Sequence, residues 1–270
     1  MNRPLSVRRA ELAIVALVLS GMAAACSSSP GTPASGSSSG PGSTPAVTGT
    51  VTVFAASSLK ETFTSIAKRF EAAHPGTTVV LSFAASSALA TQITSGAPAD
   101  VFASASAKDM ATLTSAGAAT APTTFATNSL TVVVPSANPA QIASLADLAR
   151  AGVKVAQCQP AVPCGVLAAK VLATAGLTVT PATLEPDVKS VLTKVRLGEV
   201  DAGLVYVTDA VAAAGSVTAV PMPAGVNATT AYPIAALSHA ANPAGARAFV
   251  DAVVSAEGLA VLKAAGFGAP

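Results

Sequence analysis

The feature that most constrains the fold of this chain is an alternation of strand-like and helical segments that begins at Thr50 and continues toward the C-terminus. Short runs of β-branched and aromatic residues, such as 50–56, alternate with segments whose apolar residues recur at helical spacing, such as 58–70. Repeated β–α units of this kind predict an α/β fold with parallel sheet and helices on its faces. Ligands of such sheets usually bind beyond the carboxyl ends of the strands, where helix N-termini gather.

The expected strands cover residues 50–56, 77–83, 99–104, 128–135, 153–157, 202–207 and 232–237. The expected helices cover about 58–70, the stretch from 84–87 up to Gly96, 107–116, 165–175, 187–197 and a segment begun by Asn242-Pro243.

The first strand leads directly into the first helix through Ser57 and Ser58. Ser58 occupies the expected N-cap position and Glu61 follows three residues later, which is the spacing of a capping box. Free N–H groups and the positive end of the helix dipole at such a site suit an anion. On these residues alone, an ordinary β–α turn whose serines only cap the helix is the alternative.

The composition excludes two classes of protein. Hydrophobic residues make up 51% of the chain and charged residues 10%, which is too apolar for a disordered protein. Three of the fifteen Lys and Arg residues and one of the thirteen Asp and Glu residues lie in the first 25 positions, which leaves twelve of each. Because the remainder is neutral and has no basic stripe, we expect no nucleic-acid partner.

Residues 1–25 are typical of an export signal peptide. Arg3, Arg8 and Arg9 precede an apolar stretch over 12–25, and its fourteen residues fall short of the roughly 20 needed to span a bilayer. The ending Ala23-Ala24-Ala25-Cys26 resembles a bacterial lipobox, so we expect Cys26 to be lipidated and to hold the protein at the outer face of the cell membrane. Ordinary signal cleavage nearby, with Cys26 unmodified, is the alternative.

Residues 26–49 carry the expected lipidated cysteine and a linker. From Ser27 to Gly49 the chain is almost entirely Ser, Gly, Pro, Thr and Ala, which cannot bury enough apolar surface to fold. We expect a flexible tether with a root-mean-square reach of about 25 Å.

Seven short segments follow one another at compatible spacing through most of the remaining chain: FAASSL at 54–59, SFAASSAL at 82–89, GAPADVFASA at 96–105, NSL at 128–130, PCG at 163–165, GLVY at 203–206 with DA at 209–210, and YPI at 232–234. Together they resemble the molybdate-binding proteins of ABC importers. The resemblance implies the two-lobed type II fold of periplasmic binding proteins, with a mostly parallel sheet flanked by helices in each lobe and a hinge that the chain crosses twice. On this template, residues 50–129 plus 233–270 form lobe I and residues 130–232 form lobe II.

The resemblance also implies how the ligand is held and what it is delivered to. Ser58 and Ser86 of lobe I would offer hydroxyl and backbone N–H groups, Cys164 and Val188 of lobe II their backbone N–H groups, and Tyr206 its phenol. Molybdate or tungstate would be the ligand, so molybdenum would enter only as the bound oxyanion, without direct protein–metal ligands and without a cofactor. The implied partners are an ABC permease with its ATPase, and we expect the chain to act as a monomer.

The positions of these residues support the same site independently. Ser58, Ser86, Cys164 and Val188 each lie at or just before an expected helix start, and helix N-termini directed at one point can hold a tetrahedral dianion without Lys or Arg. A site made only of donors would reject protonated phosphate, because an unpaired hydrogen in a dry site costs about 1–3 kcal/mol. Cavity size would then separate molybdate and tungstate from the smaller sulfate.

Cys158 and Cys164 are the two cysteines that remain if Cys26 carries lipid. In an oxidising exterior we expect them to form a disulfide that stiffens the loop offering the Cys164 N–H. A soft-metal site is the alternative, but His74 and His239 lie far away in the sequence.

Three other functions are compatible with parts of the sequence. A serine hydrolase could use Ser57 or Ser58, but no Gly-x-Ser-x-Gly elbow or phosphate-binding loop is present, so we expect no enzyme. A structural or adhesion lipoprotein would show no stabilisation by a small molecule. A binding protein for another oxyanion, such as sulfate, shares every feature except cavity size.

Overall fold

The computed structural model describes residues 47–270. The signal peptide expected over 1–25, the lipidation site Cys26 and most of the linker expected over 26–49 lie outside the described residues. Within the described range, no helix is both long enough and apolar enough to cross a membrane.

The strands are β1 (Gly49–Ala56), β2 (Thr77–Ala84), β3 (Val101–Ala103), β4 (Thr123–Pro135), β5 (Val155–Cys158), β6 (Thr183–Glu185), β7 (Ala202–Tyr206), β8 (Val217–Val220) and β9 (Thr229–Ala236). The α-helices are α1 (Lys60–Ala73), α2 (Ser86–Thr94), α3 (Ala107–Ser115), α4 (Pro163–Thr174), α5 (Val188–Arg196), α6 (Val207–Ala212), α7 (Pro243–Val254) and α8 (Ala256–Ala264). Two 3-10 helices, η1 (Ser57–Leu59) and η2 (Leu145–Ala149), complete the described elements.

The strands form one sheet in the order β2-β1-β3-β9-β4-β7-β5-β6, with β8 paired to β4. The pairs β1–β2, β1–β3, β5–β6 and β5–β7 are parallel, as the β–α alternation predicts. Every pair that involves β4 or β9 is antiparallel, which the alternation did not predict. The result is a mixed sheet with a parallel part at each end.

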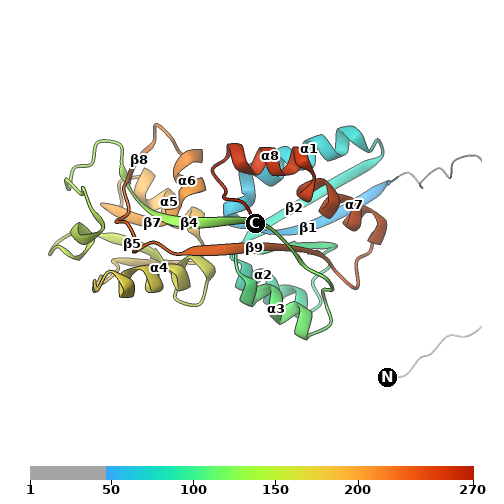
Figure 1. Cartoon of the computed structure of the whole chain (residues 1–270), viewed down its shortest axis with the longest axis horizontal. Coiled ribbons are helices and arrows are strands. Elements are labelled where there is room, and N and C mark those ends of the chain that lie inside the picture. The colour runs from blue at the N-terminus through green and yellow to red at the C-terminus, as the bar shows by residue number, and fades with distance from the viewer. Residues whose placement is uncertain (1–46) are drawn as a thin grey trace, which may run out of the picture. The chain divides into compact units, whose positions relative to one another are not determined.

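Strands β4 and β9 connect the two halves of the fold. They pair with each other over Thr123–Ser129 and Thr229–Ile234, and Figure 1 shows them running side by side from one half to the other. The chain therefore crosses twice between halves, which is the two-lobed type II arrangement. Both expected lobe boundaries fall inside these continuous strands, so the division at 129/130 and 232/233 stays a prediction.

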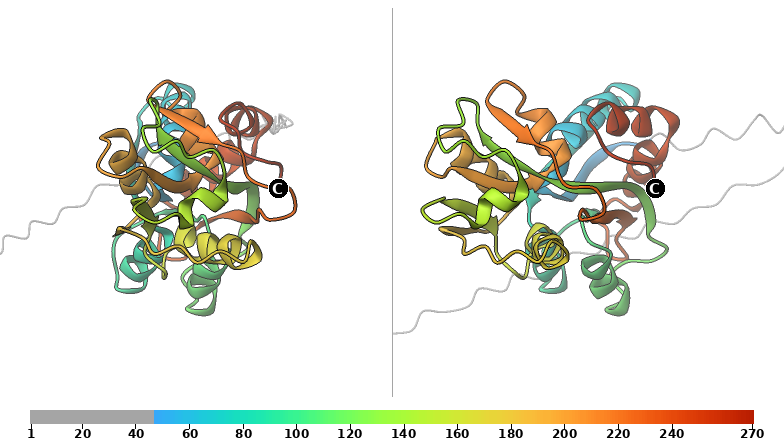
Figure 2. Two further views of the ribbon diagram at one scale, coloured as in Figure 1. Left: turned by 90° about the vertical axis from the view of Figure 1, so that its left-hand side faces the viewer. Right: turned by 60° about the vertical axis from the view of Figure 1, so that its left-hand side comes forward.

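Helices cover both faces of the sheet. In Figures 1 and 2, α2, α3 and α4 lie on one side of the strands and α1, α6 and α8 on the other. The alternation within β1 explains this layering, since Val51, Val53 and Ala55 pack into a core with α1, α7 and α8, whereas Phe54 packs into a second core with α2 and α3. A third core fills the other half, between β4, β5, β7 and helices α4 and α5.

Several element boundaries differ from those expected. Strand β4 begins at Thr123 rather than at 128, and the expected C-terminal helix is two helices, separated at Ser255, whose backbone is extended and whose side chain caps α8. The short strands β6 and β8 and the helix α6 were not predicted.

The expected capping box at Ser58 and Glu61 is wrong. The chain first makes the 3-10 turn η1, and α1 then begins at Lys60 with Leu59 in the N-cap position and no side-chain cap. Ser58 Oγ instead lies 2.9 Å from the hydroxyl of Tyr232, and the Glu61 carboxylate binds Lys189. Both groups are thus committed to distant segments of the chain rather than to their own helix.

Candidate ligand-binding site

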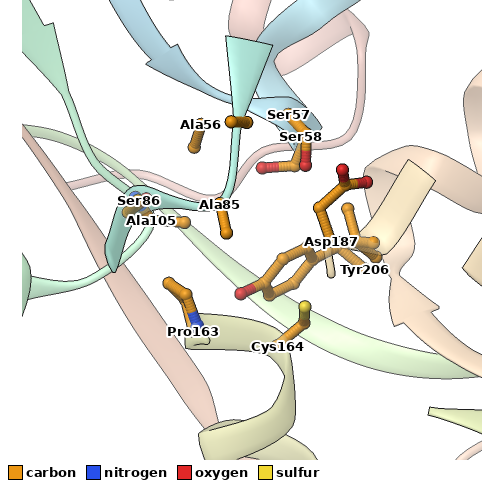
Figure 3. Close-up of a pocket in the computed structure, with 12 residues that line it drawn as sticks. Ala56, Ser57, Ser58, Ala85, Ser86, Ala105, Pro163, Cys164, Asp187 and Tyr206 are labelled. Atoms are coloured by element: carbon orange, nitrogen blue, oxygen red, sulfur yellow. The ribbon is translucent and has the colours of Figure 1, made fainter. Parts of the chain in front are cut away.

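A small cavity lies between the two halves of the fold, and all five residues predicted to bind the ligand line it (Figure 3). Its volume is about 10 Å³, roughly the space that one water molecule needs and far below the roughly 300–1,000 Å³ of sites for drug-sized ligands. The lining residues are Ala56, Ser57, Ser58, Ala84, Ala85, Ser86, Ala105, Pro163, Cys164, Asp187, Val188 and Tyr206. A cavity of this size excludes drug-sized ligands, so any solute that it holds must be small.

The wall of the cavity is built from the starts of helices. Ser58 lies in η1, Ser86 and Val188 are the first residues of α2 and α5, and Cys164 is the second residue of α4. Backbone N–H groups in the first turn of a helix have no intrahelical partner, and the helix dipole places partial positive charge there. None of the lining residues is Lys or Arg. The arrangement can therefore hold an anion through neutral donors.

The two serine hydroxyls are oriented by protein partners. The backbone N–H of Ala105 donates to Ser86 Oγ at 2.9 Å, so the Ser86 proton is free to be donated into the cavity. Ser58 Oγ and the Tyr232 hydroxyl are 2.9 Å apart, and either oxygen can be the donor. If Tyr232 donates, Ser58 also has its proton available for a ligand, and chains of this kind strengthen each donor.

The hydroxyl of Tyr206 is the most distinctive group in the cavity. Tyr206 is 1% exposed, and its hydroxyl oxygen has no hydrogen-bond partner among residues 47–270. In Figure 3 it points toward the space between Ala85 and Pro163. Burial raises the pKa of Tyr206 well above its ordinary value, with a contribution from Tyr232, so the phenol keeps its proton. A buried, protonated and unpaired donor is costly unless something in the cavity accepts its hydrogen bond.

The predicted disulfide between Cys158 and Cys164 is confirmed, with the two Cα atoms 5.8 Å apart. It joins the end of β5 to the first turn of α4, and both residues are buried. The bond therefore fixes the helix start that presents the Cys164 N–H, and it removes the thiolates that a soft metal would need.

Sequence reasoning missed two groups at the site. Asp187 lines the cavity, on the side where Figure 3 shows Ser57 and Ser58, although its Oδ1 already accepts the backbone N–H of Ser190 as the N-cap of α5. Tyr232, which is 0% exposed, contacts Ser58 through its hydroxyl. The N-cap role of Asp187 could have been read from its place before an amphipathic helix, whereas the Ser58–Tyr232 contact joins residues 174 apart and has no local signal.

The two histidines that a hydrolase could use do not lie in the cavity wall. His74 packs against Phe70 at the end of α1, with ring centroids 4.4 Å apart and the rings tilted, and His239 borders a separate depression beside α2. Ser57 and Ser58 therefore have no imidazole beside them in the lining.

A two-lobed α/β fold with a small, donor-lined cavity between its halves defines a solute-binding protein. Residues 51–268 match the family model described as "Bacterial extracellular solute-binding protein", and the chain belongs to this family. Membership assigns it a role in transport outside the cytoplasm.

Known relatives agree with this assignment. The molybdate-binding protein ModA of Mycobacterium tuberculosis is 42% identical over 95% of this chain and 96% of its own length. ModA of Escherichia coli is 35% identical over 81% of this chain and 89% of its own length. The solved structure of the periplasmic molybdate-binding protein of Azotobacter vinelandii superposes with a TM-score of 0.72 at 26% identity, covering 82% of this chain and 99% of that one.

Proposed function

We propose that this protein captures molybdate or tungstate in the cavity between its lobes and delivers the oxyanion to an ABC permease with its ATPase. The observation that carries the proposal is the buried Tyr206 hydroxyl, which has no partner among residues 47–270 and points into a cavity lined by helix starts. Relatives whose printed names specify molybdate support the choice of ligand.

In this proposal five residues contact the oxyanion. Ser58 and Ser86 donate hydroxyl protons, Cys164 and Val188 donate backbone N–H groups, and Tyr206 donates its phenol proton. The dianion needs no cation beside it, because neutral dipoles at helix starts supply the compensating field. The role requires no cofactor and no catalytic step.

The same proposal includes the position of the protein in the cell. Cys26 would carry lipid and the segment over 26–49 would serve as a tether, so a monomeric binding domain would stay near the outer face of the membrane that holds the permease.

A thermal-shift series with molybdate, tungstate, sulfate and phosphate tests the proposal. A ligand at 100 times its Kd stabilises the folded protein by about 2.7 kcal/mol, which is a shift of roughly 5–10 °C for a domain of this size. We expect this shift with molybdate and tungstate only. A response to sulfate alone would show that the ligand is sulfate and not molybdate. No response to any of the four anions would favour a structural lipoprotein.

A further inference from the structure

An ion-pair network that is buried at one end and exposed at the other connects three of the ligand-lining segments. Lys189 Nζ lies 2.7 Å from Glu61 Oε2 and 2.8 Å from Asp209 Oδ1. Glu61 follows η1 in the half that contains α1, whereas Lys189 and Asp209 belong to α5 and α6 in the other half. The Glu61–Lys189 contact therefore crosses from one lobe to the other beside the cavity.

Each member of the network is close in the chain to a proposed ligand residue. Lys189 directly follows Val188, and Glu61 comes three residues after Ser58. The second oxygen of the Asp209 carboxylate, Oδ2, accepts the backbone N–H of Tyr206 at 3.2 Å. Movement of Lys189 relative to Glu61 would consequently accompany movement of the two walls of the cavity.

The two contacts of Lys189 differ in how easily they can break. The Asp209 side chain is 0% exposed, so loss of Lys189 would leave a buried carboxylate without a counter-charge. Burial alone would lower the pKa of Lys189, but Asp209 and Glu61 raise it above its ordinary value, and the ammonium stays charged. The Glu61 side chain is 51% exposed and can be released into water at little cost.

We propose that Glu61–Lys189 is a releasable latch across the cleft, which holds the lobes together and sets the rate at which the bound oxyanion leaves. Asp209 keeps the Lys189 ammonium in place, and Glu61 engages it when the walls meet. This inference rests on the proposed function for its ligand, although the latch itself is a property of the ligand-free chain as well. An exposed ion pair of this type changes a dissociation rate by about two- to fivefold.

Two variants at one position separate the latch from a simple charge effect. Glu61→Gln removes a negative charge near a dianion, so charge alone would tighten binding, whereas loss of the latch speeds release. Glu61→Asp keeps the charge but shortens the side chain by one methylene and withdraws it from Lys189. Glu199→Gln is the matched control, because it removes the Lys194–Glu199 pair (2.6 Å) beside α5 without touching the other lobe.

The experiment measures molybdate release by stopped-flow tyrosine fluorescence, since the chain has two Tyr residues, both at the site, and no Trp. We expect release two- to fivefold faster in both Glu61 variants than in wild type and the Glu199→Gln control, with a smaller difference at high salt. Unchanged release in either Glu61 variant would overturn the latch.

A second arm needs no ligand and keeps the two proposals separable. Acrylamide quenching of tyrosine fluorescence in the ligand-free protein should increase in Glu61→Gln and Glu61→Asp but not in Glu199→Gln. Without the Glu61–Lys189 latch the cleft opens more often, and acrylamide reaches the two tyrosines more easily. Equal quenching in all four proteins would overturn the latch. If wild type fails to bind molybdate, the proposed function fails, and this arm still decides whether the latch exists.

Discussion

Tyr206 and Tyr232 meet edge to face at the site, with ring centroids 6.1 Å apart and ring planes at 72°, yet their hydroxyls differ in hydrogen bonding. The Tyr232 hydroxyl is paired with Ser58, whereas the Tyr206 hydroxyl has no partner in the described part of the chain. One tyrosine thus supports the fold and the other is available to a ligand, and this difference can be measured.

Tyr206→Phe should weaken molybdate binding without destabilising the ligand-free protein. A hydrogen bond to a charged group contributes about 1.5–3 kcal/mol, so the Kd should rise roughly 10- to 100-fold. Tyr232→Phe is the matched comparison, because it removes the partner of Ser58 and should lower the free energy of unfolding by about 1 kcal/mol. Calorimetric titration and urea unfolding measure the two quantities. Equal affinity of Tyr206→Phe and wild type would contradict the assigned role.

Ser86→Ala should lower both affinity and stability. The change removes a ligand donor and leaves the Ala105 N–H without its acceptor, which costs about 1–3 kcal/mol for a buried group. Ser87→Ala, one residue further along α2, is the control and should match wild type in both measurements. A Ser86 variant with normal binding would restrict that serine to a structural role.

Replacing Cys158 and Cys164 together by Ala should destabilise the protein. Closing so short a loop contributes about 2 kcal/mol in the chain-entropy model, which urea unfolding would detect. In the unreduced wild-type protein, mass spectrometry after alkylation should find the peptides containing these two cysteines unlabelled. Labelled thiols at both positions would show that the disulfide is absent from the protein in solution.

Alkaline titration should find both tyrosines un-ionised in the folded state. Burial, above all, raises the pKa of Tyr206 and of Tyr232 above the value of about 10 for a free phenol. Because the unfolded chain loses these protons first, the contribution to stability is intact below pH of about 10 and falls as the pH rises further. Near-ultraviolet absorbance should show no phenolate until the protein unfolds, and a gradual rise near pH 10 in folded protein would refute this.

Much of the fold could be predicted from local patterns. The apolar alternation of β1 and the helical spacing in α1 and α5 depend on neighbours in the sequence, and these elements lie close to where they were expected. Strands β6 and β8 have only three and four residues, too few for a periodic signal. The antiparallel passage of β4 and β9 between lobes depends on pairing between residues about 100 positions apart, which no local pattern records.

At the candidate site, too, features with a local sequence signal could be predicted and contacts between distant residues could not. The positions of Ser86 and Val188 at helix starts were readable because caps and turns are local. The partners of Ser58 and Glu61 were not, because Tyr232 is 174 residues from Ser58 and Lys189 is 128 residues from Glu61. The capping-box spacing predicted that Ser58 and Glu61 would bond to each other's backbone. In the structure their side chains instead contact Tyr232 and Lys189.

The most direct test of the proposed oxyanion site is a crystal structure of the protein grown with molybdate, with anomalous scattering used to locate molybdenum. We predict a single strong peak inside the cavity, with its oxygens within hydrogen-bond distance of the Tyr206 hydroxyl, the Ser58 and Ser86 hydroxyls and the N–H groups of Cys164 and Val188. A peak elsewhere on the protein, or an empty cavity at saturating molybdate, would contradict the account.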